Sequence, residues 1–367
     1  MKLNSRLSAV LFLRSLGLFV RSPSQGLKRL LFLLICSIPA SLFGQLPAIG
    51  IIDYYGVHEL SIVQVQQALQ IKLGERLSES SIPDVLVLAK QRLEAISGVL
   101  NARLELVCCD AGKTILYVGI EERGAQAPHF RTAPKGSARL PAEIVAAGDA
   151  FQKALMEAIL QGDASEDHSQ GHTLNHNPAL RAIQERYITL ATRDLVNLRD
   201  VLRNSADVGQ RALAAQVIGY APEKRVVVTD LGYGMLDPDS SVRNNAMRVL
   251  WVIAGFAQEH PELKIEIDSH PFVEMLNSVV WTDRNKSSAA LMALTGQRDS
   301  VLLTDLRKHA LTSLVEMARW KSAGHANPAY VILGRIAGLS EKQISDAWDR
   351  NDRETVIAAA SKAASRD

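Results

Sequence analysis

The sequence predicts a multidomain α+β chain, in which a small domain of mixed strands and helices precedes an all-helical array. Between residues 49 and 123, segments with the two-residue period of strands alternate with segments of helical period. After residue 178 helical segments follow one another, and a short pattern returns at intervals of 32 to 44 residues. Aromatic residues make up only 5% of the 367 residues, and this favours helices over a β-sandwich or barrel.

Residues 1–44 have the features of a signal peptide or an N-terminal anchor. A basic stretch that ends at Arg29 precedes the apolar run "LLFLLICSIPASLFG". About nine apolar residues come before Pro39, which is too short for a membrane span but typical of a signal peptide. We expect export to the periplasm with cleavage near Ala40 or Gly44. Without cleavage, the segment would associate the chain with a membrane.

The distribution of charge argues against a nucleic-acid partner. The chain has 41 Lys and Arg residues and 39 Asp and Glu residues, a net charge of +2. Six of the basic residues and none of the acidic ones lie in 1–44, so the rest has 35 basic residues (41 − 6) against 39 acidic ones, a net charge of −4. Nucleic-acid-binding proteins usually carry a basic surplus.

The domain at 49–123 has the predicted order strand, helix, helix, strand, strand. The apolar stretch 49–57 is rich in branched and aromatic residues and indicates a strand. Helical periods cover 61–70 and 81–97, the second with Pro83 in its first turn, where the missing N–H costs nothing. The alternating segments that begin at Val99 and Thr114 are joined by the turn "DAGK" and predict two paired strands.

This domain resembles POTRA domains, the small periplasmic modules of outer-membrane assembly, two-partner secretion and septal division proteins. The resemblance is carried by "SIVQVQQAL", by the turn "LGERL", by the passage "LEAISGVLNARLEL" and by a last strand that ends at Glu121 and Glu122. It implies a docking module that binds a partner strand at a sheet edge. No run of amphipathic strands follows, so a membrane barrel is not expected. An unrelated small α+β domain is the alternative.

Two adjacent cysteines, Cys108 and Cys109, end the first of the paired strands. Neighbouring cysteines rarely bond to each other, so we expect two small strand residues, one facing inward and one outward. An intermolecular disulfide in an oxidising compartment is the alternative.

Residues 124–141 are rich in Gly, Pro and Ala without periodicity and are expected to form a linker. A helix then begins near 142. The stretch "QGDASEDHSQGHTLNHNP" follows and places His168, His172 and His176 four residues apart. On a helix they would share a face and could bind zinc or copper, but the Gly and Pro residues favour a solvated loop. We therefore predict no metal site and keep these histidines as weak candidates.

The helical region contains a repeat. Asp207, Arg211 and Ala214 return 32 residues later as Asp239, Arg243 and Ala246. A third copy follows after 44 more residues, with Asp283, Ser287 and Ala290 in the same register. Intervals of this length are typical of helical solenoids, because one helix pair cannot bury both of its apolar faces.

The pattern "DxxxRxxA" followed by branched apolar residues resembles HEAT repeats, the armadillo-type solenoid family. The resemblance implies an α-solenoid over 142–360 and a ladder of ion pairs between units, at Asp207, Arg211, Asp239, Arg243 and Asp283. Ser287 stands where an Arg would be, so we expect the ladder to be broken or weakened at the third unit.

These features predict a non-enzymatic scaffold of the cell envelope. No catalytic motif and no nucleotide loop is found, so we expect no catalytic residue and no cofactor. The partner would be a protein or peptide, bound on the concave surface of the solenoid, and the small domain would dock elsewhere in the envelope. The alternative is a metal-dependent or chromophore-lyase-like enzyme that uses the loop of His168, His172 and His176. A third reading is a cytoplasmic scaffold with a membrane anchor.

Overall fold

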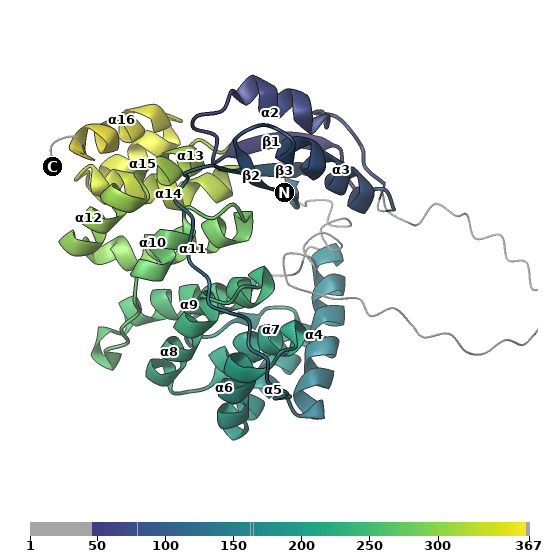
Figure 1. Ribbon diagram of the computed structural model, residues 1–367. Coiled ribbons are helices and arrows are strands. Elements are labelled where there is room, and N and C mark those ends of the chain that lie inside the picture. The colour runs from purple at the N-terminus through teal and green to yellow at the C-terminus, as the bar shows by residue number, and fades with distance from the viewer. Residues whose placement is uncertain (1–45, 79, 162, 164, 365–367) are drawn as a thin grey trace, which may run out of the picture.

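The computed structural model describes residues 46–78, 80–161, 163 and 165–364 (Figure 1). The expected signal or anchor at 1–44 lies outside the described residues. Within the described part, no helix is both long enough and apolar enough to cross a membrane.

The small domain has the element order that the sequence predicts. Its elements are β1 (Ile49–Tyr55), α2 (Ile62–Leu69), α3 (Ile82–Glu94), β2 (Val99–Asp110) and β3 (Lys113–Glu122). Pro83 lies in the first turn of α3, and Gly98 takes the positive φ of +98° that the passage into β2 requires.

The rest of the described chain is mainly helical. Its helices are α4 (Ala142–Gln161), α5 (Pro178–Arg193), α6 (Leu195–Asn204), α7 (Val208–Val217), α8 (Lys224–Met235), α9 (Ser240–Glu259), α10 (His270–Met275), α11 (Trp281–Leu294), α12 (Ser300–His309), α13 (Leu311–Ala318), α14 (Ala323–Ile336), α15 (Glu341–Asp349) and α16 (Arg353–Ala364), with short 3-10 helices η1 (Ile218–Tyr220), η2 (Pro261–Leu263) and η3 (Thr295–Gln297). The expectation of an all-helical region is wrong between α4 and α5, where β4 (Glu166–Asp167) and β5 (Leu174–Asn175) form a small antiparallel hairpin.

These helices form a repeated solenoid. Helices α7, α9, α11 and α14 contact one another in this order, and α6, α8, α10 and α13 each pack on one of them. The aligned residues Ala214, Ala246 and Ala290 lie on three successive helices of this row and are all 0% exposed. Small residues allow close contact: a Cβ at Gly234 on α8 would lie 3.1 Å from that of Ala246.

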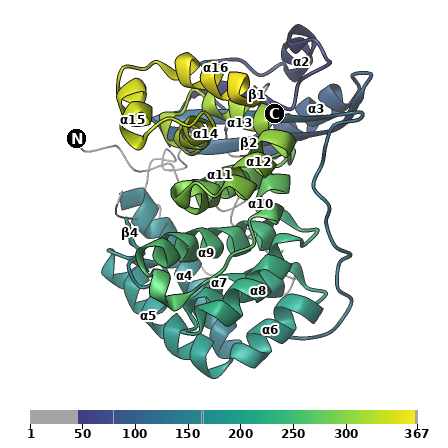
Figure 2. The same cartoon turned by 90° about the vertical axis from the view of Figure 1, so that its left-hand side faces the viewer.

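The three-stranded sheet is buried on both faces. The strand order is β1-β3-β2, with β1 parallel and β2 antiparallel to the central β3. Leu116 and Val118 belong to the core beneath α2 and α3, whereas Ile115 and Tyr117 belong to the core of the solenoid. The small domain therefore packs directly on the C-terminal half of the solenoid (Figures 1 and 2).

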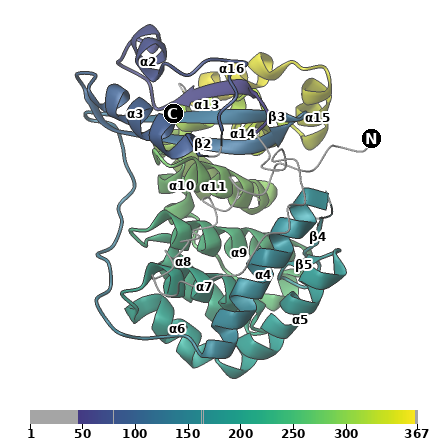
Figure 3. The ribbon, with the colours of Figure 1, turned by 90° about the vertical axis from the view of Figure 1, so that its right-hand side faces the viewer.

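The segment 124–141, expected to be a linker, is an extended strap that lies along the solenoid (Figures 2 and 3). Its Gly136 forms a parallel bridge with Ser205, and the N–H of Ala206 donates to the Gly136 carbonyl at 2.8 Å. Further on, Leu140 is buried, and its N–H donates to the side chain of Gln210. The strap thus belongs to the folded structure.

Candidate functional site

Three buried arginines link successive units of the solenoid. Arg211 donates to Asp237 through two nitrogens, at 2.8 and 3.0 Å. Arg243 binds Asp283 in the same way, with a shortest distance of 2.7 Å. Both pairs have carboxylates with no exposed side-chain surface.

The third link differs from the expected one. Ser287 is buried and its hydroxyl contacts the sulfur of Met247. The arginine of this unit is Arg284, which donates to Glu316 at 2.9 Å. The prediction that Ser287 breaks or weakens the ladder is wrong, because Arg284, three residues before Ser287 on α11, supplies the cation of this link.

Asp207 and Asp239 have a different role from the predicted one. The Asp207 carboxylate accepts the N–H of Gln210, and that of Asp239 accepts the N–H of Ser241, so the two residues cap α7 and α9. The carboxylate that pairs with Arg211 is Asp237, two residues before Asp239 in the turn.

The strap adds two side chains to this ladder. Arg131 donates to Asp237 at 2.5 Å and lies 4.0 Å from the ring centroid of Tyr233. The Phe130 ring lies 4.0 Å from the guanidinium carbon of Arg243. Asp237 therefore binds two arginines, one from the solenoid and one from the strap.

The three candidate histidines do not converge. His168 contacts Glu166 at 3.2 Å, and His176 contacts the hydroxyl of Ser165 at the same distance. His172 packs against Tyr220, with ring centroids 5.3 Å apart. Among the described residues, no group of three His, Cys, Asp or Glu side chains could hold a metal ion.

His172 is nonetheless an unusual group. It is 9% exposed, and its Nε2 has no hydrogen-bond partner among the described residues. Burial, and then the nearby charge of Lys224, lower its pKa to about 4. A neutral imidazole in this position can offer a hydrogen bond to a bound molecule.

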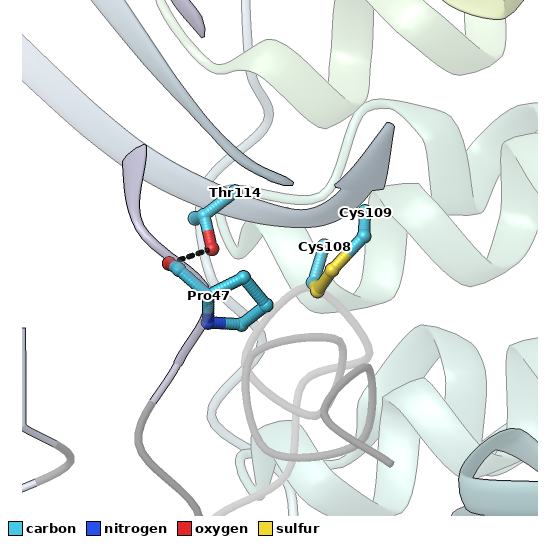
Figure 4. The surroundings of a disulfide bond; sticks show 4 residues. All are labelled: Pro47, Cys108, Cys109 and Thr114. Atoms are coloured by element: carbon cyan, nitrogen blue, oxygen red, sulfur yellow. Dashed lines mark hydrogen bonds between the residues drawn. A yellow bond between two sulfur atoms is a disulfide. The ribbon is translucent and has the colours of Figure 1, made fainter. Parts of the chain in front are cut away.

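Cys108 and Cys109 form a disulfide with each other, contrary to the expectation of two separate strand residues (Figure 4). They lie at the end of β2, beside the start of β3, where the Thr114 hydroxyl donates to the Pro47 carbonyl at 2.7 Å. Cys108 is also one of the residues that line a cavity, whose other lining residues belong to the helical region.

This cavity has a volume of about 320 Å³, within the range of small-molecule sites. Its wall is mainly apolar, with side chains from α4, α9 and η1. The apolar lining residues are Phe151, Leu155, Ile159, Tyr220, Val249 and Val252. Polar groups complete it: His172, Gln184, Gln216, Asn245, Arg248 and Glu166.

A row of polar side chains leads from the cavity across the solenoid. Its members, which we call the polar row, are Gln216 on α7, Arg248 on α9, Lys286 on α11 and His325 on α14. Each of the four is partly exposed. Gln216 and Arg248 line the same cavity. The charge of Arg248 acts on Lys286, and that of Lys286 acts on His325.

The electrostatics of the polar row favour an anion. Burial alone would raise the pKa of Glu166, but Arg248 and His168 outweigh this effect and lower it to about 2. Glu166 therefore neutralises Arg248, with which it forms an ion pair. Lys286 has no hydrogen-bond or ion-pair partner among the described residues, and burial followed by the charge of Arg248 lowers its pKa to about 7.

The far end of the row meets the small domain. His325 contacts the Tyr117 hydroxyl at 2.7 Å, and Tyr117 stacks on Trp281 with ring centroids 4.9 Å apart. Burial and the charge of Lys286 lower the pKa of His325 to about 4. The polar row therefore ends at His325 on α14, where the sheet of the small domain contacts it.

The sequence carries one signal for this site that the repeat alignment could have used. Gln216 and Arg248 are separated by the same 32 residues as the aligned alanines. Lys286 follows after 38 residues, six fewer than the 44 that separate Ala246 and Ala290, so it lies outside the repeat register and no motif marks it.

Comparisons with known proteins give a structural similarity but no sequence match. No protein-family model matches the chain, and no curated protein matches its sequence. A solved designed armadillo repeat protein is similar in structure over 54% of this chain and 98% of its own, with 16% sequence identity and a TM-score of 0.33.

Proposed function

We propose that the chain is a non-enzymatic scaffold of the cell envelope that binds a protein or peptide partner along the polar row. The observation that carries the proposal is the row itself. One partly exposed hydrogen-bond donor lies on each of α7, α9, α11 and α14, the helices that contact one another in this order. An extended peptide that crosses these helices would meet one polar group on each of them.

The repeated geometry also favours binding over catalysis. The buried arginines Arg211, Arg243 and Arg284 are saturated by carboxylates and backbone carbonyls, so they stabilise the array. The polar row, by contrast, holds Lys286, which has no ion-pair partner within the part of the chain that the structure describes. A partner with acidic groups would complement that charge.

The small domain supplies a second surface, and we interpret it as a POTRA-like docking module. Within the described residues β2 pairs with no strand other than β3, and its other edge is the one to which a partner strand would be added. Several large apolar side chains on its outer elements are exposed: Ile62, Val63, Val87, Leu88 and Leu100. Exposed apolar side chains on neighbouring elements are typical of interaction surfaces.

The experiment is photo-crosslinking of the full tagged chain in cells. A p-benzoylphenylalanine residue placed at Gln216 reports on the polar row, and one at Val196, which is 82% exposed on α6, is the matched control. We expect a discrete protein adduct at Gln216 that Val196 does not give, and that Arg248→Ala with Lys286→Ala weakens. Equal adducts at both sites, or none at Gln216, would refute the proposal.

The location is tested separately by cell fractionation with protease accessibility. We expect the chain in the envelope fraction, cleaved by protease only after the outer membrane is opened. Recovery in the cytosol would refute the envelope assignment. It would not decide whether the polar row binds a partner, which the crosslinking experiment tests.

A further inference from the structure

The cavity beside the polar row contains groups that a protein ligand alone does not explain. It is walled by apolar side chains from α4 and α9, and it holds the nine-tenths buried His172 with an Nε2 that lacks a partner. An unpaired polar atom in a buried site costs free energy unless a bound molecule or water satisfies it.

The charges of the residues near the cavity do not balance among the described residues. Arg248 lines the cavity and is paired with Glu166. The charges of Arg248 and Glu166 both act on Lys286, but Lys286 forms an ion pair with neither residue. His325 faces it from α14 and is held neutral at pH 7. When Lys286 is protonated, one positive charge without a counterion among the described residues therefore lies within electrostatic range of Arg248 and Glu166, which line the cavity.

We propose that this cavity binds a small amphipathic carboxylic acid. Its carboxylate would lie between Arg248 and Lys286, and its apolar part would pack against Phe151, Leu155 and Val249. The site has the mixed character typical of small-molecule pockets, with an apolar wall and a few convergent polar groups. His172 offers a hydrogen bond to a second polar group of the ligand.

Binding is coupled to protonation of Lys286. A carboxylate next to the amine favours the charged form and raises its pKa from about 7, so the complex takes up a proton near neutral pH. The groups that set this response are Arg248 on α9, Glu166 on β4 and His325 on α14. Above pH 8 the free amine is mostly neutral and the carboxylate binds more weakly.

The test uses the purified full chain and two probes of the same length, decanoate and decanol, below their aggregation limits. Isothermal titration calorimetry at pH 7 in phosphate and in Tris measures affinity and proton uptake. We expect decanoate to bind with net proton uptake and decanol to bind more weakly. Lys286→Met should weaken decanoate about tenfold, reduce the proton uptake and leave decanol nearly unchanged.

Two further variants keep the proposal falsifiable. Val249→Trp fills the cavity from α9 and should abolish binding of both probes, and Leu155→Trp does the same from α4 if the first variant does not fold. Lys342→Met, at a side chain 82% exposed on α15, is the control and should bind as the wild type does.

Decanoate affinity that is equal in the wild type and Lys286→Met would overturn the proposal, as would decanoate binding that survives a filled cavity. These measurements need no protein partner. A failure here is therefore distinct from a failure of the crosslinking experiment.

Discussion

The two buried ladder pairs, which look equivalent, should respond differently to loss of their arginine. In Arg243→Met, the hydroxyl of Ser278, at 2.7 Å, is the one side-chain partner that Asp283 keeps among the described residues. In Arg211→Met, Asp237 keeps the guanidinium of Arg131 from the strap. We expect the first variant to be clearly the less stable.

The magnitude follows from the burial of the stranded carboxylate. The side chain of Asp283 has no exposed surface, so Arg243→Met leaves a buried, uncompensated charge, which costs about 3–5 kcal/mol. Asp237 remains paired in Arg211→Met, so we expect a loss of about 2 kcal/mol, mainly from packing and the hydrogen bond to the Ser205 carbonyl. The double variant Arg131→Met with Arg211→Met should approach Arg243→Met.

Urea unfolding followed by circular dichroism measures these differences, with Arg181→Met on the exposed face of α5 as the control. Equal losses for Arg211→Met and Arg243→Met would refute the argument, because the strap would then contribute nothing to Asp237.

Three further substitutions test the packing around the sheet and the solenoid. Burial raises the pKa of Glu105 to about 7, so ionisation of this carboxyl destabilises the fold as the pH rises from about 4.5 to 7. We therefore expect Glu105→Gln to be more stable than the wild type by at most about 3 kcal/mol at pH 8 and equally stable at pH 4. Urea unfolding at the two pH values measures this difference. Gly119→Ala would place a Cβ 2.4 Å from the Val279 carbonyl and should lower stability by about 1–3 kcal/mol, and an unchanged melting temperature would contradict the close contact of sheet and solenoid. Ala246→Leu should overpack the crossing near Gly234 by about 1–3 kcal/mol, and calorimetry would show no loss if the helices could separate freely.

The element order of the small domain and the stacking of the solenoid could be predicted from periodicity, because each is a local pattern. The double burial of the sheet was missed, although the sequence carries a signal for it. The central strand contains the unbroken apolar run from Ile115 to Val118, which is typical of a strand covered on both faces. We interpreted that run only as the return strand of a hairpin.

The ladder shows why pattern alone cannot assign partners. The turn "DPDS" contains two carboxylates, Asp237 and Asp239, and the alignment selected the one that repeats. In the structure the repeating residue caps a helix, and its neighbour pairs with Arg211. Only the three-dimensional path of the turn separates these roles. Similarly, the strap residues Phe130 and Arg131 lie in a stretch whose composition indicates a linker, and their contacts depend on docking that no local pattern encodes.

The central strand joins two hydrophobic cores that form from distant parts of the chain. Residues near 60 and 90 complete the core on one face of the sheet. The core on the other face needs Trp281, Trp320 and His325, which are synthesised much later. During synthesis one side of the sheet therefore remains bare until almost the whole polypeptide has emerged. Chains truncated before these residues would leave this apolar face of the sheet exposed, where it could aggregate or bind a chaperone.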